Sequence, residues 1–456
     1  MVLELSKHRV VIVGAGVSGL STATFLANVP CTVLEAGEMP GGNVRTDYVD
    51  GRVVDRAANG WLDSEPAMDR MLDLLGLTAQ ALPASEKSAI RWIYADGAMQ
   101  VAPLSPPSLL RSRLIPWWAK LRMLLEPFMP RRTGADETVH DFVSRRLGRW
   151  FVARMVGPMV AGIYAARPDQ LSLMAAFPKM AAMEKEYRSL FLAMLAKRRG
   201  GAPSGHLQSL PRGAGQLTSA MADRIGENLI CNSPVEGLTR TKGGWRVHTP
   251  TGDIEASAVV LACPAPAQAK LVRGLDSTLA AALDEISYAP VTVVVTAWPA
   301  GAFDRSPHGF GVLVAEGEDL GVLGTLFTSE AYPSQSKEGE FLLRTMVGGA
   351  VDPQAAALPH QALLDRVFAA HERLLGARRA EPSMVRIYRH PAGIPQYTMG
   401  HPSRVATVKA AQNRFGGLFF AGNHLEGIGV KDCVATGEQV ATDVRNFLEI
   451  TLSSEV

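Results

Sequence analysis

The start of the chain carries two apolar runs separated by a glycine-rich turn. The first run is short and unbroken, as is typical of a strand buried on both faces, and predicts a strand over Arg9–Val13. The longer run after the turn predicts a helix over Ser18–Ala27. A second strand is predicted over Thr32–Glu35. Together these elements form a βαβ unit.

The pattern then becomes irregular. A turn-rich stretch extends to about residue 66, and a helix is predicted near Ala67–Leu75. Residues 89–102 alternate in polarity around Asp96-Gly97, which predicts a hairpin. Further strands are predicted near Leu207, over Leu229–Cys231, Trp245–His248 and Val259–Cys263, within 290–350 and over Leu418–Ala421, and further helices over 361–375 and Cys433–Phe447.

Residues 105–200 differ from both flanks, because prolines separate apolar, helix-favouring blocks and strand patterns are absent. We interpret this segment as a helical insertion. A chain of 456 residues exceeds the size of one ordinary core, so two or three domains are expected.

Composition narrows the class of protein. The chain is 47% hydrophobic and 20% charged, as in globular proteins, and its net charge of +2 gives no overall basic field for nucleic acid. The four cysteines, Cys31, Cys231, Cys263 and Cys433, show no metal-ligand spacing. We therefore expect buried thiols and no metal site. No segment predicts a transmembrane helix.

Charge is concentrated in residues 101–132. This stretch combines Trp117, Trp118 and several leucines with one acid, Glu126, and six basic residues: Arg111, Arg113, Lys120, Arg122, Arg131 and Arg132. Such a mixture suits the boundary between headgroups and acyl chains of an anionic membrane. An ordinary amphipathic helix that covers the core would give the same pattern.

The glycine-rich turn carries the first chemical signal. Gly14, Gly16 and Gly19 have the G-x-G-x-x-G spacing between a strand and a helix, and Glu35 ends the next strand. The glycines permit a tight turn, close approach to a pyrophosphate and close helix packing, while the acid suits a ribose hydroxyl. This arrangement predicts dinucleotide binding.

The motif continues past Glu35 with Gly41-Gly42 and Arg45. This longer pattern resembles FAD-binding families of the amine oxidase type. The C-terminal stretch that ends in Gly422-Asn423 looks like their second flavin-contacting strand. A helix follows from about Asp432, and its N-terminus suits negative charge on a reduced flavin.

The resemblance then narrows to one family. Over nearly its whole length the chain resembles the oxygen-dependent protoporphyrinogen oxidase family. The matching stretches include MVGPMVAGIYAARPDQLSLMAAFPKM, SYAPVTVVV, GFGVLV, IPQYTMGH and AGNHLEGIGVKDCVATG. The block around Gly162 and the last two stretches are the most specific to that family.

The resemblance implies a fold class and three parts. We expect an α/β protein with a Rossmann-like FAD-binding domain of the amine oxidase type, a mixed-sheet substrate domain and a helical membrane-binding insertion. The FAD-binding part would comprise residues 1–88, 206–270 and 395–456, the substrate part 89–100 and 271–394, and the membrane-associated part 101–205.

The resemblance also implies site residues. FAD would be held without a covalent bond, and four aliphatic or glycine positions and one arginine would contact the substrate. The implied FAD residues are Gly14, Ala15, Gly16, Val17, Ser18, Gly19, Glu35, Ala36, Gly41, Gly42, Asn43, Arg45, Ala57, Ala58, Asn59, Gly60, Val235, Gly422, Asn423, Ile428, Gly429 and Val430. The implied substrate residues are Arg91, Gly162, Leu313, Leu326 and Met346.

The implied activity is oxidation of protoporphyrinogen IX to protoporphyrin IX in haem biosynthesis, with three rounds that consume O2 and release H2O2. No side-chain acid or base is assigned, and a structural role is expected for His424. The protein would lie on the cytoplasmic face of the cytoplasmic membrane. Contacts with ferrochelatase and a homodimer stay open.

Several alternatives remain. Coproporphyrinogen III is the second candidate substrate, and a flavin amine oxidase, a desaturase-like enzyme and a non-enzymatic flavoprotein are more distant ones. Arg91 could be an ordinary surface residue, and the aliphatic positions plain core. One departure concerns Ala57, where relatives have glycine. A positive φ there would strain alanine by about 1 kcal/mol.

Overall fold

The computed structural model describes residues 9–132, 134, 136–199 and 205–454, so parts of the predicted segments 1–88, 101–205 and 395–456 lie outside the described residues. A parallel sheet collects strands from distant parts of the chain. Its order is β10 (Leu229–Ile230), β2 (Cys31–Leu34), β1 (Val10–Val13), β14 (Ala258–Leu261) and β20 (Leu418–Phe420). Because all of its pairs are parallel, the carboxyl ends of these strands meet at one edge.

Alternate residues of β1 face opposite sides of this sheet and belong to different cores. Val10 and Ile12 pack with helices α2 (Val17–Leu26), α3 (Pro66–Leu74), α12 (Gly215–Ile225) and α18 (Val430–Ser454). Val11 and Val13 face the other layer. That layer consists of α13 (Ala265–Val272), α14 (Ser277–Asp284), α17 (His401–Arg414) and the small sheet of β11 (Gly237–Thr241), β12 (Gly244–Thr249) and β13 (Gly252–Ala256).

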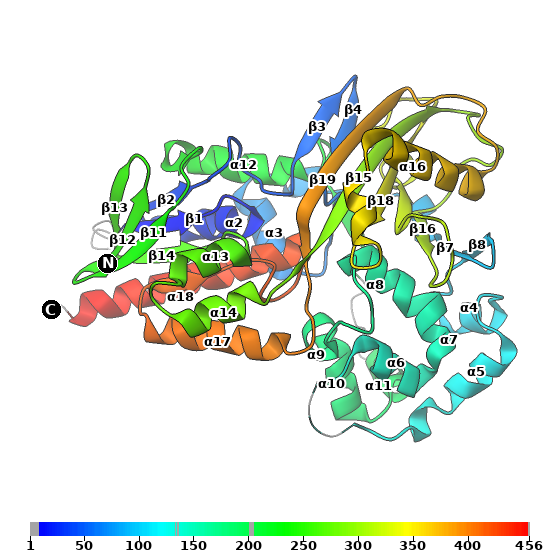
Figure 1. Ribbon diagram of the computed structural model, residues 1–456, viewed down its shortest axis with the longest axis horizontal. Coiled ribbons are helices and arrows are strands. Elements are labelled where there is room, and N and C mark those ends of the chain that lie inside the picture. The colour runs from blue at the N-terminus through cyan, green and yellow to red at the C-terminus, as the bar shows by residue number, and fades with distance from the viewer. Residues whose placement is uncertain (1–8, 133, 135, 200–204, 455–456) are drawn as a thin grey trace.

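A second, mixed sheet of seven strands lies beside the first (Figure 1). Its order is β19 (Met384–Pro395), β15 (Tyr288–Pro299), β18 (Glu340–Gly348), β17 (Gly324–Phe327), β16 (Gly311–Val314), β7 (Arg91–Ala95) and β8 (Ala98–Val101). Helix α16 (His360–Leu375) covers one face. The opposite face meets the hairpin of β3 (Thr46–Val49) and β4 (Arg52–Asp55), with Val54 buried against it.

Residues 105–199 form helices that gather below β7, β8 and β16 in Figure 1. These are α4 (Pro106–Arg111), α5 (Trp117–Leu124), α6 (Val139–Leu147), α7 (Arg149–Phe151), α8 (Gly157–Tyr164), α9 (Leu173–Ala176), α10 (Pro178–Tyr187) and α11 (Leu190–Arg199). Fully buried Arg146 bonds Glu126 and Glu184 at their centre. None of the described helices has the length and apolar character that a bilayer crossing requires.

Short elements complete the fold. Strands β5 (Trp61–Leu62), β9 (Leu207–Ser209) and β6 (Leu82–Pro83) form a third sheet, and α15 (Thr328–Ala331) follows β17.

The structure corrects three expectations. The stretch between the βαβ unit and residue 66 holds the β3–β4 hairpin, whose turn residues Asp50 and Gly51 both have positive φ. Strand β19 and helix α17 were not anticipated. Ala57 does not have a positive φ, so the expected strain at that position is absent.

Candidate functional site

The glycine-rich turn and the start of α2 form the first part of the site. Gly16 is the N-cap of α2 and provides no side-chain cap, so backbone N–H groups at this helix start remain available to an anion. The N–H of Ala15 donates to Glu35 Oε2 (2.7 Å), and the N–H of Gly37 donates to Glu35 Oε1 (2.9 Å). The predicted ribose ligand therefore lies directly beside the turn.

A second glycine loop lies on the first. The N–H of Gly41 donates to the carbonyl of Ala15 (2.7 Å), and a Cβ at Gly42 would lie 3.2 Å from the Cα of Gly16. Buried Arg45 Nε has no hydrogen-bond partner among the described residues. Two segments that the sequence assigned to one phosphate site are thus in contact.

The start of α18 approaches the same place, because α18 packs closely along α2. A Cβ at Gly437 would lie 2.5 Å from the Cβ of Ser21 and 2.9 Å from the backbone N of Thr22. Burial raises the pKa of the nearby Cys433 thiol to about 12, so this cysteine is protonated at neutral pH. A protonated, buried thiol is inert, as the sequence predicted.

The loop before α18 is fixed by hydrogen bonds. Tyr397 is fully buried, and its hydroxyl donates to the carbonyl of Asn423 (2.6 Å). His424 Nε2 lies 3.1 Å from Gln268 Oε1, and burial lowers the pKa of His424 to about 3. His424 is therefore neutral and bound within the fold, which agrees with the predicted structural role.

Asn59, Trp61 and Tyr332 add buried donors that have no partner among the described residues. Asn59 Nδ2 and Trp61 Nε1 are buried, and no described residue accepts a hydrogen bond from either. The hydroxyl of Tyr332 is also without a partner there, and it would lie 2.8 Å from a Cβ at Gly60.

These features fit a flavin dinucleotide. Helix starts and glycine turns suit its phosphates, and orphan donors suit the carbonyl and nitrogen acceptors of a flavin ring. The remaining predicted cofactor residues flank the same loops: Val17, Ser18 and Gly19 begin α2, Ala36 follows Glu35, Asn43 lies between Gly42 and Arg45, Ala58 packs against the α2 core, Val235 packs against the core on the other side of the sheet, Gly422 precedes Asn423, and Ile428, Gly429 and Val430 lead into α18.

The predicted substrate residues share one face of the seven-stranded sheet. Leu313 and Met346 both pair with Gly324, and Leu326 pairs with Gly311, so their side chains point away from α16. A Cβ at Gly162 of α8 would lie 2.6 Å from Leu313 Cδ2. Helix α8 thus faces the sheet where the aliphatic residues gather.

Arg91 lies near one end of this face. It begins β7, pairs with Gly311 and is exposed, with its guanidinium carbon 5.5 Å from the centre of the Phe310 ring. The structure thus places Arg91 at the rim of the aliphatic face. This position suits both a substrate-binding role and an ordinary surface role for Arg91.

One polar residue on this face was missed by sequence reasoning. Arg344 pairs with Leu326 and lies two residues before Met346, so it points to the aliphatic face. The sequence did carry a signal for it: residues two apart in a strand point to the same face, so Arg344 was bound to share the face of Met346. An arginine within an apolar strand such as LLRTMVG is usually expected to point to solvent, so Arg344 was not among the predicted site residues.

Comparisons with known proteins agree with this geometry. The family model of flavin-containing amine oxidoreductases matches residues 17–445. The chain is 30% identical to the chloroplastic protoporphyrinogen oxidase of Nicotiana tabacum, over 96% of this chain and 85% of that one. It is also 30% identical to the coproporphyrinogen III oxidase of Propionibacterium freudenreichii, over 97% of this chain and 91% of that one.

Solved structures show the same fold. A crystal structure of an Exiguobacterium sp. protein superposes with a TM-score of 0.84 at 24% identity and covers 97% of this chain and 99% of that one. Cyclohexylamine oxidase from Brevibacterium oxydans superposes with a TM-score of 0.72 at 19% identity, over 97% of this chain and 99% of that one.

Proposed function

Because the chain belongs to the flavin-containing amine oxidoreductase family, we propose that it is an FAD-dependent oxidase that converts a porphyrinogen to a porphyrin in haem biosynthesis. The predicted family and the amine oxidase type of fold are confirmed by the family match and the structural neighbours. FAD is the cofactor of this family. The observation that carries the proposal is the aliphatic face of the mixed sheet beside the nucleotide loops.

FAD, when bound, supplies the acceptor for the hydrogens of the substrate. In our proposal the start of α2 and the Gly41–Arg45 loop hold its pyrophosphate, and Glu35 binds a ribose. The start of α18 stabilises negative charge at the flavin. Cys433 stays a protonated thiol, so FAD is held without a covalent bond. Release of free FAD on denaturation would test this.

The pocket chemistry suits a large apolar ring with a few carboxylates. Leu313, Leu326 and Met346 would contact the ring faces opposite Gly162, and Arg91 would bind a carboxylate at the rim. No side-chain base is needed in this proposal, and His424 is neutral and directed to Gln268. Each of three rounds removes two hydrogens from the substrate and reduces one O2 to H2O2.

We propose protoporphyrinogen IX as the substrate, since Arg91 is the cation that the family resemblance assigns to it. Coproporphyrinogen III is a second candidate, and buried Arg344 favours it, because a substrate with four carboxylates needs more cations. Relatives with both names match this chain equally well.

The test follows porphyrin fluorescence in air with each porphyrinogen supplied separately to the purified yellow protein. Porphyrin formation with H2O2 release supports the proposal. A protein that retains FAD and oxidises neither porphyrinogen contradicts it, and amines would then be screened as substrates.

We also propose that the helical segment 101–205 binds a membrane surface and that the chain divides into the three parts expected from the sequence. Trp117 and Phe128 are 72% and 80% exposed, and Arg111 and Arg113 of the same stretch are exposed as well. The single acid of the stretch 101–132, Glu126, is fully buried. This surface therefore presents aromatic and basic groups together.

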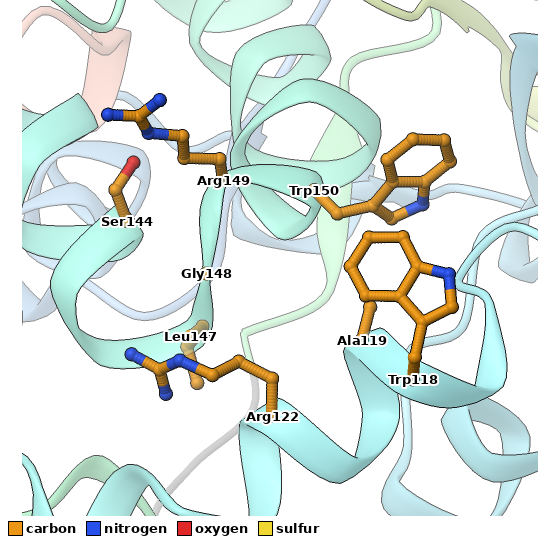
Figure 2. Close-up of a pocket in the computed structure, with 8 residues that line it drawn as sticks. All are labelled: Trp118, Ala119, Arg122, Ser144, Leu147, Gly148, Arg149 and Trp150. Atoms are coloured by element: carbon orange, nitrogen blue, oxygen red, sulfur yellow. The ribbon is translucent and has the colours of Figure 1, made fainter.

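A hollow of about 360 Å³ lies between α5 and α7 at this surface. Figure 2 shows the indole rings of Trp118 and Trp150 on one side of it and Arg122 and Arg149 on the other. The two rings meet edge to face with centroids 5.6 Å apart. The membrane in question would be the cytoplasmic membrane, approached from the cytoplasm.

A further inference from the structure

Arg344 belongs to a row of residues that crosses the mixed sheet. Arg91 pairs with Gly311, Gly311 with Leu326, Leu326 with Arg344, and Arg344 with Val295. Residues that pair directly across a sheet point to the same face. Arg91 and Arg344 therefore lie on the aliphatic face, three strand spacings or about 14 Å apart.

The two arginines differ in their surroundings. Arg91 is exposed at the rim, whereas Arg344 is 4% exposed. Within the described part of the chain, Arg344 Nε and Nη1 have no hydrogen-bond partner, and no carboxylate forms a hydrogen bond with its guanidinium. A buried cation without a partner is costly, so the arrangement indicates an anionic ligand.

The acid that acts on Arg344 is Asp55, and it makes no hydrogen bond to the guanidinium. Asp55 Oδ1 instead accepts from Thr46 Oγ1 and from the N–H of Ala214. Burial raises the pKa of Asp55 to about 6. Burial lowers the pKa of Arg344 to about 10, so Arg344 is still protonated at neutral pH.

We propose that Arg344 is a specificity-determining residue that binds a carboxylate at the inner end of the porphyrinogen pocket. This inference rests on the proposed function. Protoporphyrinogen IX carries its two propionates at one edge, which Arg91 can bind alone. Coproporphyrinogen III carries a propionate on every ring, so bound with one edge at Arg91 it places carboxylates at the opposite edge. Arg344 thus gives coproporphyrinogen III a carboxylate contact that protoporphyrinogen IX cannot make. If the experiment below bears this out, coproporphyrinogen III replaces protoporphyrinogen IX as the preferred substrate of the proposed function.

The negatively charged reduced flavin is the other source of anionic charge near this sheet. The row favours the substrate, because Arg344 pairs with Leu326 on β17 and the next residue on its own strand face is Met346. Both were assigned to the substrate pocket independently of Arg344.

The experiment compares kcat/KM for coproporphyrinogen III with that for protoporphyrinogen IX in the FAD-loaded full chain. Arg344→Met is expected to lower this ratio at least tenfold, and Arg344→Lys to restore part of it. Arg386→Met is the matched control, since Arg386 pairs with the same Val295 from the other side and is exposed. It should leave the ratio within twofold.

An unchanged ratio in Arg344→Met would overturn the inference. Loss of FAD from a folded Arg344→Met protein would also overturn the inference, because it would show that the guanidinium binds the flavin.

A second measurement does not depend on folding of the Arg344 variants. In Arg91→Met, which removes the exposed cation, fluorescence titration should show coproporphyrin III binding at least tenfold more tightly than protoporphyrin IX. Equal binding would contradict the proposal. If the wild-type protein binds both porphyrins but oxidises neither porphyrinogen, the proposed function fails while the binding comparison still decides the role of Arg344.

Discussion

At the scale of single residues, burial decides which titratable groups take part in chemistry. His371 on α16 and His424 beside the flavin loop are both fully buried, and burial lowers the pKa of each to about 3. Both are therefore neutral near pH 7 and act as hydrogen-bonding groups. Arg344 contrasts with them, since it keeps its charge in an equally buried position.

These histidines predict a loss of stability in acid. In the unfolded chain their pKa is about 6.5, so between pH 6.5 and 3 the unfolded state binds protons that the folded state does not. Each histidine then lowers the free energy of unfolding by about 1.4 kcal/mol per pH unit as the pH falls. Burial raises the pKa of Asp55 to about 6 in the fold, so between about pH 6 and 3.9 the folded state binds a proton that the unfolded state does not. In this range Asp55 therefore raises the free energy of unfolding as the pH falls, and it partly offsets the effect of the histidines.

Guanidinium unfolding at pH 7 and pH 5 checks this. Between pH 7 and pH 5, the free energy of unfolding should fall less in His371→Gln than in the wild-type protein. An identical pH dependence in the variant would contradict the assignment of His371 as a neutral buried group.

Gly162 predicts a pocket effect. In Gly162→Ala the new Cβ would lie 2.6 Å from Leu313 Cδ2, so the leucine must rotate out of its position in the wall of the proposed pocket. A shift of this size should lower kcat/KM for the porphyrinogen by about tenfold. Adding Leu313→Ala removes the clash, and the double variant should be no worse than Leu313→Ala alone. Independent, additive losses would show that the two residues do not meet in the working enzyme.

At the scale of elements, the packing of α2 against α18 brings two helix starts to the proposed cofactor site. Their close approach depends on Gly437, where an added Cβ would meet Ser21 and the backbone of Thr22. Since backbone atoms cannot turn aside, any side chain at this position must move one of the helices.

Gly437→Ala should therefore destabilise the protein by about 1–3 kcal/mol and weaken FAD binding. The fraction of bound FAD after dialysis and the midpoint of thermal unfolding measure the two effects. Gln439→Ala, on an exposed position of the same helix, is the control. Full FAD retention in Gly437→Ala would show that FAD binding does not depend on the close packing of α2 and α18.

Elements with strong local signals were predictable from the sequence. The βαβ unit, the Asp96-Gly97 hairpin and helix α16 follow their patterns closely. The hairpin at Asp50-Gly51 had an equally clear turn signal but was overlooked between irregular segments. The burial of Arg344 could not be predicted, because it depends on packing over β18 by segments distant in the chain.

At the scale of the whole molecule, one surface combines exposed apolar and basic side chains. The helical segment gathers exposed tryptophans, leucines and arginines, while two of its acids, Glu126 and Glu184, are turned inward to Arg146. Because Glu126 is the single acid of the stretch 101–132, the outer surface of that stretch is basic. An anionic bilayer is the surface that such a face complements.

Cosedimentation with phosphatidylglycerol vesicles at low salt tests this. The double substitution Trp117→Glu and Phe128→Glu should lower the bound fraction at least fivefold, since it places acids on the contacting face. Ile230→Glu, at an exposed position on β10, should have little effect. A wild-type protein that stays in the supernatant with these vesicles would refute membrane binding.

The order of strands in the parallel sheet also shapes how the protein is made. Strand β14 ends at Leu261, whereas its neighbour β20 begins at Leu418, so the sheet stays incomplete until most of the chain has left the ribosome. Pairings over such sequence separation form slowly and leave strand edges exposed. We expect nascent chains that end before β20 to bind chaperones rather than FAD, and cofactor capture to occur late in synthesis.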